Sequence, residues 1–499
     1  MKRDHALQQI QERRRWDLLV IGGGASGLGV ALEAVTRGYR TLLVEQHDFS
    51  KGTSSRSTKL IHGGVRYLRQ GNFTLVRDAL RERGRLIRNA PQLVHDLAFV
   101  VPLYRWRDFG FYGPGLKLYD LLAGRLSLGK SRILSRLETI KRLPGIKTQG
   151  LKGGVLYHDA QFDDSRLAIS LAQSITALGG VVANYVQVVS LLKAGRKTMG
   201  AVVKDVLSGE VYEVAARVTV NATGIFADRI RRLDDASESP VLAASQGTHI
   251  VLDSSFLPAS TALMVPKTED GRMLFAIPWH KRLLIGTTDV PLEEVSLEPV
   301  PLAEEVDFLL RHAAQYLSKA PQASDILSMF AGIRPLVSTK QGPTSRLSRD
   351  HQILLSNSGL VSLVGGKWTT YRKMGEDAVN AVEKTGGIER RRGGGTYDLR
   401  IEGAENGGGG EPAERLHHSL TDTRQDVLRG VREEMACTVE DVLARRTRAL
   451  FLDARAAIEI APEVAAIMAQ ELDRSEAWQQ EQVASFVELA KNYLPPATS

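Results

Sequence analysis

A segment dense in hydrogen-bond donors runs from residue 53 to residue 72, TSSRSTKLIHGGVRYLRQGN. It combines Ser, Thr, Arg and Lys side chains with a histidine and a Gly-Gly pair, and no acid pairs with its cations. It begins eight residues past an apolar run that predicts a buried strand. The segment is too polar for a protein core. It suits the oxygen atoms of a bound ligand, and a solvated basic loop is the alternative.

Three glycines upstream of this segment, Gly22, Gly24 and Gly27, follow the pattern G-x-G-x-x-G. The first permits a tight turn, the second lets a pyrophosphate approach the backbone, and the third lets a helix pack closely on a strand. The N-terminus of that helix adds partial positive charge. Glu45 closes the next predicted strand, where an acid accepts hydrogen bonds from a ribose diol. An acid there disfavours the 2′-phosphate of NADP.

The donor-rich segment favours FAD over NAD. A NAD enzyme usually continues from such a unit into further βαβ units, whereas this chain inserts the segment directly after Glu45. A flavin needs donors for its pyrophosphate and ribityl chain, and groups near its N5, N1 and C2 carbonyl. The segment offers such groups at Ser54, Ser55, Ser57, Thr58 and Lys59.

A second glycine pair, Gly365 and Gly366, occurs in VGGKWTTYRK. It closes a predicted strand, and Thr369 and Thr370 open the next helix. A helix N-terminus aimed at the pyrimidine end of a flavin would stabilise its anionic reduced form. On this stretch alone, a plain strand-to-helix turn is an equal explanation.

The composition is that of a globular protein with a large core. The 499 residues are 43% apolar and 24% charged, which allows two or three domains. A net charge of +8 permits attraction to anionic lipids, nucleic acid or phosphorylated metabolites. The single cysteine, Cys437, excludes intramolecular disulfides, and we expect no metal site. The N-terminus has no apolar secretory segment, and the longest uncharged run, 18–32, is shorter than a bilayer span, so we expect any membrane contact to be peripheral.

Strand, glycine turn and helix patterns recur along the chain and predict an α/β fold. They occur at 16–46, 153–182, 217–230 and 359–383, and short β-like runs fill 245–290. Residues 105–150 fit no single pattern. A glycine-rich, charged stretch then precedes a helical tail, which predicts a linker and a separate helical domain.

A series of motifs resembles one flavoprotein family, the FAD-dependent glycerol-3-phosphate dehydrogenases of bacteria and mitochondria, which reduce quinone. In chain order the motifs are VIGGGASGLG, GTSSRSTKLIHGGVRYL, NATGIFAD, GTHIVL, IPW, IGTTD, GIRPL, SRD and GGKWTTYRK. The second and the last are specific to the family, whereas the glycine fingerprint is widespread. The resemblance runs from about residue 15 to 380, and the tail resembles the family's cap domain. The calcium-binding extension of mitochondrial members has no counterpart, so we expect a bacterial form.

This resemblance implies an α/β fold, α+β overall, of the D-amino-acid-oxidase-like type. It implies a discontinuous Rossmann-like FAD-binding domain over 1–90, 151–240 and 331–385. A β-rich substrate domain would then take 91–150 and 241–330. Residues 386–412 would form the linker, and residues 413–499 the C-terminal α-helical cap domain.

The resemblance also implies the site residues. It places FAD contacts at Gly22, Gly24, Gly27, Glu45, Ser54, Ser55, Ser57, Lys59, His62, Val186, Gly224, Lys367 and Thr369. It builds the substrate site from Arg66, Tyr67, His249, Arg334, Arg349 and Lys367. Guanidinium forks suit a dianionic phosphate, since each donates two parallel hydrogen bonds. Each arginine alone is more often a surface residue, and only the resemblance brings them together.

The implied reaction oxidises sn-glycerol 3-phosphate to dihydroxyacetone phosphate. We expect hydride transfer from C2 to flavin N5, with His249 accepting the C2 hydroxyl proton. Arg334 and Lys367 would stabilise the developing negative charge. A hydrogen-bonded strand histidine is the alternative reading of His249. His62 is a second candidate, either for proton handling or for packing on the flavin.

The family passes its electrons to ubiquinone or menaquinone. We therefore expect a peripheral seat on the cytoplasmic side of the inner or plasma membrane, or a cytoplasmic location, and we allow for a homodimer. Residues 109–136 mix aromatics, leucines and cations and would dip into a membrane interface, or else form an ordinary surface helix. The basic residues 1–15 would form either a solvated arm or a lipid-facing helix.

Three other functions compete with this one. The nearest is a glycerol-3-phosphate oxidase that uses O2, since motifs do not show whether oxygen reaches the flavin. An FAD-dependent flavoprotein that binds or modifies RNA is disfavoured, because the charge excess is small and the arginines belong to small-molecule motifs. We accordingly expect no nucleic-acid partner. A non-catalytic flavin-binding protein is disfavoured because no residue of the catalytic set is missing.

Overall fold

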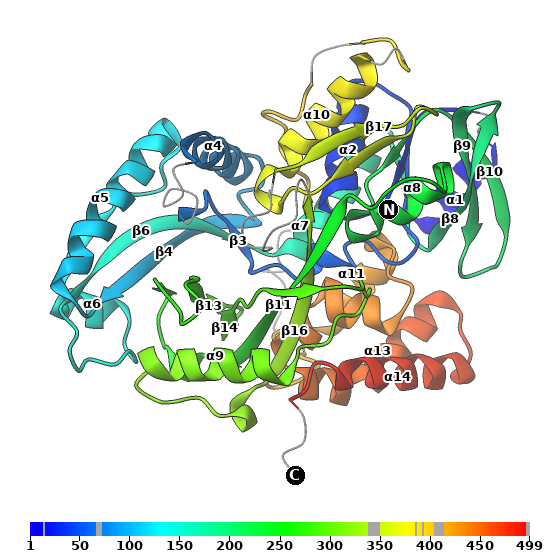
Figure 1. The fold of residues 1–499 in the computed structure, drawn as a ribbon. Helices are drawn as coiled ribbons and strands as arrows, with labels where there is room; N and C mark the ends of the chain where they lie inside the picture. Colours follow the sequence, from blue (N-terminus) through cyan, green and yellow to red (C-terminus); the bar gives the residue numbers. More distant parts are fainter. Residues whose placement is uncertain are drawn as a thin grey trace.

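Two β-sheets and a C-terminal group of helices make up the part of the chain that this computed structural model describes (Figure 1). The described residues are 1–12, 15–65, 72–337, 350–384, 387–391, 394–403 and 414–495. Helices and mixed sheets alternate up to residue 384, and the last described segment is helical. This arrangement agrees with the predicted fold class.

The first sheet has the strand order β17-β18-β10-β1-β2-β7, and β8 and β9 are joined to it through β10. Its strands are β1 (Trp16–Ile21), β2 (Thr41–Val44), β7 (Val181–Ala183), β8 (Val186–Ala194), β9 (Lys197–Asp205), β10 (Val211–Asn221), β17 (Gln352–Leu355) and β18 (Val361–Val364). The parallel strands β1 and β2 are buried along their whole length. Continuous apolar runs are typical of such buried parallel strands. The strand order places β1 and β2, the strands of the predicted βαβ unit, in the interior of this sheet.

Helices cover this sheet and share its core. They are α1 (Arg3–Glu12), α2 (Ala25–Thr36), α7 (Asp164–Ala177), α8 (Ala227–Asp234) and α10 (Tyr371–Lys384). Leu28, Leu32 and Val35 recur at helical spacing in α2 and pack in the same apolar cluster as β1 and β2. In Figure 1, α2 and α10 lie side by side at the top of the molecule, and the two helices are in extensive contact.

The second sheet has the order β15-β11-β14-β13-β12-β4-β6-β3, with β16 paired to β11 and β5 paired to β6. Its strands are β3 (Leu60–Ile61), β4 (Val94–Leu103), β5 (Arg132–Ser135), β6 (Gly153–Phe162), β11 (Leu242–Asp253), β12 (Ala262–Val265), β13 (Leu274–Trp279), β14 (Arg282–Gly286), β15 (Val290–Leu292) and β16 (Ser328–Val337). In the antiparallel β11–β16 pair, His249 lies opposite Phe330 and Ser245 lies opposite Arg334. Because side chains alternate along a strand, His249 and Arg334 are on the same face of this sheet.

The helices on the second sheet include the region that the sequence left unassigned. They are α4 (Phe73–Asn89), α5 (Trp106–Ala123), α6 (Arg136–Arg142) and α9 (Ala303–Tyr316). Residues 105–150 thus form α5, β5 and α6. Pro114 and several glycines interrupt the helical pattern of α5, and its exposed Trp106, Leu118 and Leu121 obscure the apolar face.

The strand pairing differs from the predicted domain boundaries at three strands. The sequence assigns residues 151–240 to the FAD-binding domain, yet β6 lies in the second sheet between β4 and β3. Likewise β3 and the end of β16 pair in the second sheet. An apolar run does not reveal which sheet it joins, because pairing depends on partners far along the chain. We propose the predicted division with these strands moved to the substrate domain.

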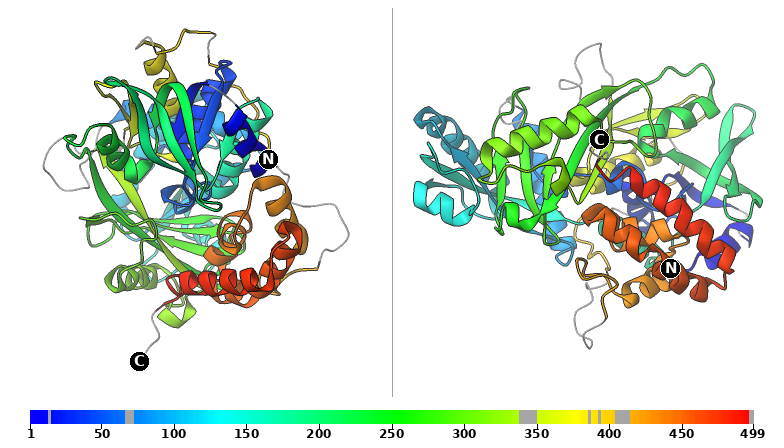
Figure 2. Two further views of the ribbon diagram at one scale, coloured as in Figure 1. Left: turned by 90° about the vertical axis from the view of Figure 1, so that its right-hand side faces the viewer. Right: turned by 90° about the horizontal axis from the view of Figure 1, so that it is seen from below.

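The C-terminal helices pack against the second sheet and against the segment after β2. They are α11 (Arg424–Glu434), α12 (Ala449–Leu452), α13 (Ala454–Leu472) and α14 (Glu476–Lys491), with a π-helical turn over Asp441–Arg446. Phe451 of α12 contacts Phe330 of β16, with ring centroids 4.8 Å apart. Figure 2 shows these orange and red helices grouped on one side of the green strands.

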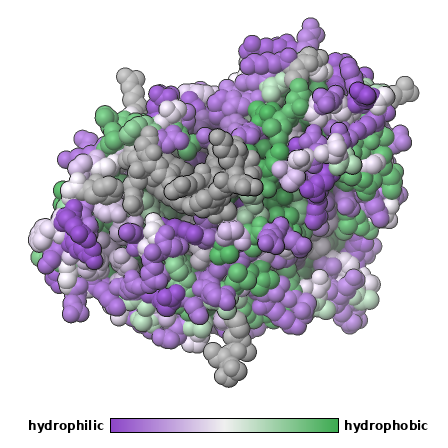
Figure 3. Space-filling view, viewed as in Figure 1, coloured by the Kyte–Doolittle hydropathy of each residue, from purple (hydrophilic) through white to green (hydrophobic). Residues whose placement is uncertain are grey.

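Hydrophilic side chains cover most of the face seen in Figure 1, and apolar side chains gather in a band on its right-hand half (Figure 3).

Candidate functional site

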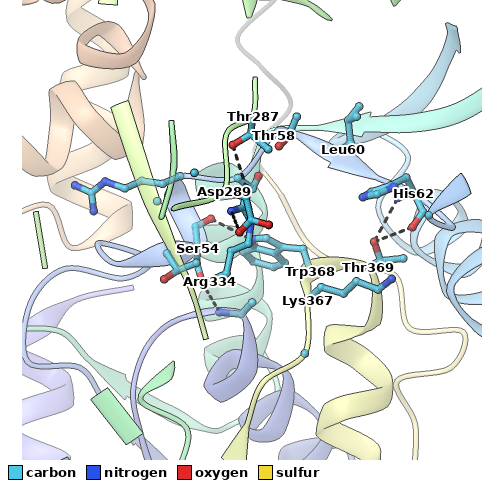
Figure 4. A pocket seen from close by; sticks show the side chains of 18 of the residues that line it. Ser54, Thr58, Leu60, His62, Thr287, Asp289, Arg334, Lys367, Trp368 and Thr369 are labelled. Carbon is cyan, nitrogen blue, oxygen red and sulfur yellow. Dashed lines mark hydrogen bonds and ion pairs between the residues drawn. The ribbon is translucent and has the colours of Figure 1, made fainter. Parts of the chain in front are cut away.

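A cavity of about 330 Å³ opens among the segment 53–65, the facing strands of the second sheet and the glycine turn at 365–366. Segments far apart in the sequence contribute its lining, which includes Ser54, Ser57, Thr58, His62, Gly224, His249, Thr287, Asp289, Arg334, Lys367, Trp368 and Thr369 (Figure 4). The three predicted catalytic side chains, His249, Arg334 and Lys367, therefore lie in one cavity.

The glycine fingerprint forms the turn from β1 into α2. Gly22 has a φ of +110°, and a Cβ there would lie 2.7 Å from the carbonyl oxygen of Ala222. A Cβ on Gly27 would lie 1.9 Å from the Gly22 carbonyl oxygen, so only glycine lets helix and strand approach this closely. A Cβ on Gly24 would lie 2.9 Å from Ser54 Oγ. The turn thus presents bare backbone at a helix N-terminus, as a pyrophosphate requires.

Glu45 follows β2 at the same edge of the sheet. Its carboxylate accepts hydrogen bonds from the backbone N–H of Gly23 at 2.6 Å and of His47 at 3.0 Å. Burial raises the pKa of Glu45, and the two N–H donors oppose that shift. Val186 begins β8 beside it, and its N–H donates to the Glu45 carbonyl oxygen at 2.7 Å. The predicted ribose contact and the predicted contact at Val186 are therefore neighbours.

The segment 53–59 has one side in the cavity. Ser54, Ser57 and Thr58 line it. Ser54 Oγ accepts a hydrogen bond of 2.9 Å from the N–H of Ala25, the first residue of α2. Trp368 Nε1 donates to the Ser54 carbonyl oxygen at 2.9 Å. The donor loop is thus joined directly to the N-terminus of α2 and to the second glycine turn.

Within the segment 53–59, the predicted cofactor contacts Ser55 and Lys59 are not among the residues that line the cavity, and their side chains bond elsewhere. Gly22, Gly24, Gly27, Glu45 and Val186 also lie outside the cavity lining. Ser55 Oγ donates to the Gly52 carbonyl oxygen. Lys59 is fully buried and donates to the Ser55 carbonyl oxygen at 2.8 Å and to Asp164 Oδ2 at 2.6 Å. Its ammonium also lies 5.2 Å from the ring centre of Trp279. A buried carboxylate thus holds the Lys59 side chain, and cofactor contact at Lys59 stays a prediction.

The second glycine turn lies across the cavity from the donor loop. Gly365 and Gly366 have φ values of +75° and +85° and precede Lys367 and Thr369. In Figure 4 the Lys367 side chain extends toward Thr369 and His62. The N–H of His62 donates to Thr369 Oγ1 at 3.3 Å.

Gly224 also lines the cavity. It opens the short helical turn Gly224–Phe226 before α8 with a φ of +57°.

His249 is 98% buried against Phe330, on which its ring stacks with centroids 4.9 Å apart. Thr58 Oγ1 lies 2.9 Å from Nε2, and Nδ1 has no hydrogen-bond partner among the described residues. Burial, together with the positive charges of Lys59 and Arg334, holds the pKa of His249 well below its ordinary value. The imidazole is therefore neutral near pH 7, which is the form that accepts a proton.

The Arg334 guanidinium is held by the turn that follows β14. It donates to Thr287 Oγ1 and to the Thr288 carbonyl oxygen, both at 3.0 Å, and lies 3.4 Å from Asp289 Oδ1. A Cβ on Gly247 would lie 2.2 Å from the Nη2 atom of Arg334, so the glycine makes room for this guanidinium.

Some predicted residues lie outside the described part of the chain, and some lining residues were not predicted. Arg66, Tyr67 and Arg349 are not among the described residues. Arg272 lines the cavity, and its Nη1 lies 3.8 Å from Asp289 Oδ2, so one carboxylate lies between Arg272 and Arg334. The motif IGTTD contributes Thr287, Thr288 and Asp289 to the cavity lining, a role that the sequence alone does not indicate. Nothing around Arg272 in the sequence distinguishes it from a surface arginine.

Two family profiles match the chain and together cover most of it. The FAD dependent oxidoreductase family matches residues 17–372, and the C-terminal domain of alpha-glycerophosphate oxidase matches residues 361–481. The first match covers more than half of the chain. The glycine turn, Glu45 and the donor side chains form a cradle that fits FAD, and FAD is the cofactor of this protein.

Curated relatives align with almost the whole chain. The mitochondrial glycerol-3-phosphate dehydrogenase of Homo sapiens is 38% identical over 99% of this chain and 75% of its own length. The same enzyme of Mus musculus is 38% identical over 96% of this chain and 74% of its own length.

Solved structures share the fold. The glycerol-3-phosphate dehydrogenase of Bacillus halodurans, complexed with FAD, superposes with a TM-score of 0.78 at 29% identity, over 100% of this chain and 99% of that one. The L-alpha-glycerophosphate oxidase of Mycoplasma pneumoniae, with FAD bound, has a TM-score of 0.60 at 17% identity, over 74% of this chain and 95% of that one, and shows the fold alone. The chain therefore belongs to the glycerol-3-phosphate dehydrogenases of the FAD-dependent oxidoreductase family.

Proposed function

We propose that this protein oxidises sn-glycerol 3-phosphate to dihydroxyacetone phosphate and passes the electrons to a membrane quinone. The observation that carries the proposal is the meeting of His249, Arg334 and Lys367 in the cavity that the donor loop and the second glycine turn also line. The names of the relatives supply the substrate.

FAD would be held along a path from the first glycine turn to the second. Gly22, Gly24 and Gly27 would receive its pyrophosphate, and Glu45 its ribose diol. Ser54, Ser57, His62, Gly224 and Thr369 would line the part nearer the cavity. When bound, FAD supplies the acceptor for the hydride that leaves C2 of the substrate.

His249 would accept the proton of the C2 hydroxyl. A base must be unprotonated before the reaction, and its surroundings keep His249 neutral. The Thr58 hydroxyl bonds Nε2 and itself lines the cavity, so a substrate hydroxyl in this corner meets the paired Thr58 and His249. Loss of that proton as hydride leaves gives the ketone and leaves an imidazolium.

Arg334 and Lys367 would bind the anionic substrate and stabilise negative charge on its C2 oxygen. The Thr287, Thr288 and Asp289 contacts fix the Arg334 guanidinium before substrate arrives, so little reorganisation opposes binding. Arg272 shares Asp289 with Arg334 and adds a second guanidinium for a dianionic phosphate.

A spectroscopic titration without oxygen tests cofactor and substrate together. The purified protein should show flavin absorption bands, and sn-glycerol 3-phosphate should bleach them. The enantiomer sn-glycerol 1-phosphate and unphosphorylated glycerol are matched controls, because they keep the carbon chain but change its stereochemistry or its charge. Flavin bands that persist with sn-glycerol 3-phosphate but bleach with another alcohol would overturn the substrate assignment.

An oxidase is the second candidate, because the C-terminal profile bears the name of alpha-glycerophosphate oxidase. Turnover with a soluble quinone analogue should exceed turnover with O2, measured as hydrogen peroxide. Hydrogen peroxide formed in step with substrate loss, at a rate that quinone does not raise, would favour the oxidase.

The proposed quinone implies a peripheral seat on the membrane. Trp106 and Leu121 of α5 and Leu137 of α6 are at least 70% exposed, and arginines and lysines occur near them in the sequence. Large apolar groups mixed with cations are typical of segments that enter a lipid interface. Within the described ranges, no helix combines the length and apolarity that crossing a bilayer requires. Release from vesicles by salt alone would indicate electrostatic binding, and release only by detergent would indicate apolar insertion.

A further inference from the structure

Three arginines of the C-terminal helical domain reach the outer side of the segment 48–59, whose inner side lines the cavity. They are Arg445, Arg446 and Arg448, and each is nearly or fully buried. This segment has an irregular backbone, in which Ser50 and Lys59 both have a φ of +62°. Such a backbone has few ladder hydrogen bonds of its own, so side chains from elsewhere must fix it.

Arg445 and Arg446 bind the beginning of the segment through hydrogen bonds to Asp48. Arg446 donates to both carboxylate oxygens of Asp48 at 2.7 and 2.8 Å, and Arg445 Nε donates to Oδ2 at 2.5 Å. The π-helical turn Asp441–Arg446 ends in these two adjacent arginines, and such turns are rare and frequent at functional sites. Lys51 donates to Glu440, the residue directly before this turn, at 2.6 Å.

Arg448 binds the middle of the segment through a hydrogen bond to Ser55. Its guanidinium donates to the Ser55 carbonyl oxygen at 2.8 Å, to Ser165 Oγ at 2.7 Å and to Asp164 Oδ1 at 3.1 Å. Arg448 itself has a φ of +71°, a left-handed conformation that is uncommon for a residue other than glycine. Its surroundings hold this backbone in place because the guanidinium has several partners.

Asp164 joins Arg448 to the end of the segment. Its Oδ2 accepts from the Ser57 N–H at 3.1 Å, from Ser57 Oγ at 2.7 Å and from Lys59 Nζ at 2.6 Å. Its Oδ1 accepts from Arg448. One buried carboxylate at the start of α7 thus ties the C-terminal domain to Ser57 and Lys59.

The inner side of the same residues faces the reaction. Ser54 is bonded to the first N–H of α2, and Thr58 is bonded to Nε2 of His249. Arg448 therefore lies one hydrogen bond from Ser55, which is flanked by Ser54 and followed three residues later by Thr58. A displacement of Ser55 would therefore move both Ser54, the proposed cofactor contact, and Thr58, the hydrogen-bond partner of His249.

We propose that the C-terminal helical domain positions the cofactor loop, with Arg448 and Asp164 as positioning residues that hold the segment 53–59 against FAD. The domain touches neither substrate nor flavin in this proposal. It acts through the Ser55 carbonyl group, Ser57 and Lys59. The proposal rests on the proposed FAD contact at Ser54, and it assigns a role to a domain that the proposed chemistry does not use.

The test compares full-length holoproteins in which the contacts of Arg448 or Asp164 with the segment 53–59 are removed. Arg448→Met removes the guanidinium but keeps an unbranched chain, and Arg448→Lys keeps a charged donor of lower reach. We expect Arg448→Met to release FAD about tenfold or more faster than wild type, with Arg448→Lys in between. Release is measured as the rise of free-flavin fluorescence after dilution, and amide hydrogen exchange of 53–59 should quicken in the same order.

Glu434→Gln is the matched control. Glu434 forms a buried ion pair with Arg166, with both contacts at 2.7 Å, so it also joins the C-terminal domain to α7. It bonds no residue of the segment 53–59, and Arg446, which lies 3.7 Å from its carboxylate, bonds Asp48 but no residue of 53–59. The control should lower the thermal unfolding midpoint without quickening FAD release or exchange in 53–59.

Equal acceleration of FAD release by Glu434→Gln and Arg448→Met would overturn the proposal, since it would show that Arg448 affects FAD binding only through the overall stability of the protein. Unchanged release and exchange in Arg448→Met would overturn it as well. If Arg448→Met does not fold, Asp164→Asn removes the carboxylate through which Arg448 is joined to Ser57 and Lys59. Release of FAD from Asp164→Asn at the wild-type rate would refute the proposal. Failure of the substrate titration would leave these readouts intact, because they depend on FAD and the backbone alone.

Discussion

Gly247→Ala should damage the proposed substrate site while sparing the fold. A methyl group on Gly247 would lie 2.2 Å from Arg334 Nη2 and 2.5 Å from Thr287 Oγ1. Real Cβ contacts are essentially never shorter than 3.0 Å, so the guanidinium must move by about 0.8 Å or more. The atom that moves is the end of a flexible side chain, so the free energy of unfolding should change by about 1 kcal/mol or less.

The same movement is costly for catalysis. Arg334 holds 3.0 Å hydrogen bonds to Thr287 Oγ1 and the Thr288 carbonyl oxygen, and a shift of this size changes the geometry of both and the position of the guanidinium. Misplacement of a positioning group by about 1 Å costs about 100-fold in rate. We therefore expect kcat/KM for sn-glycerol 3-phosphate to fall about 100-fold, or about 2.7 kcal/mol.

The assay is anaerobic stopped-flow bleaching of the flavin bands over a range of substrate concentrations, with thermal unfolding and FAD content measured on the same samples. Gly115→Ala is the control, because a Cβ at Gly115 meets nothing within 4 Å. A Gly247→Ala protein with normal FAD content and wild-type kcat/KM would refute the assignment of Arg334 to the substrate site.

Three further predictions concern His249 and Asp48. His249→Asn should slow flavin bleaching about 10²–10⁴-fold with FAD content unchanged, and wild-type bleaching would exclude His249 as the base. The pKa of His249 is lowered in the folded protein, so the imidazole stays neutral when the pH falls past its ordinary pKa of about 6.5. The rate of flavin bleaching should therefore stay constant down to pH 6.5 and decline only at lower pH. A midpoint near pH 7 in the rate profile would contradict this. Asp48→Asn should reduce the free energy of unfolding by about 3–5 kcal/mol, measured by urea denaturation at pH 7. Burial raises the pKa of Asp48, but Arg446 and Arg445 lower it to about 2, so this stabilisation is present above the ordinary pKa near 3.8 and is lost as pH falls toward 2. A difference between Asp48→Asn and wild type that is the same at pH 7 and pH 2 would contradict this origin.

The sequence predicted the elements whose signal is local. The strand at 18–21, the glycine turn and the helix after it were recognisable because apolar spacing and glycine positions lie within one short stretch. The same holds for the turn at Gly365 and Gly366. The helix α5 was missed because Pro114 and its glycines break the period on which such a prediction depends.

The side of the donor loop that each residue faces was not predictable. Ser54 and Ser57 line the cavity, whereas Ser55 and Lys59 do not. A regular strand would have given this by alternation, but the loop has no fixed period. Its orientation depends on Asp164 and Arg448, which lie more than 100 and nearly 400 residues further along the chain. Arg272 was missed for a similar reason, since its partner Asp289 is brought to it only by the folded sheet.

The chemistry of the domain contact favours positioning over stability as the role of its arginines. Apolar contacts such as Phe330 with Phe451 already bury surface between the C-terminal helices and the second sheet. Buried ion pairs add little beyond well-packed apolar residues, since desolvation offsets most of the attraction. Unlike the contacts of an apolar side chain, the hydrogen bonds of a guanidinium are directional, because its N–H donors lie in one plane and suit only a few arrangements of partner oxygens. Arg448 uses those directions on a backbone carbonyl, a hydroxyl and a carboxylate, which fixes the loop in one place.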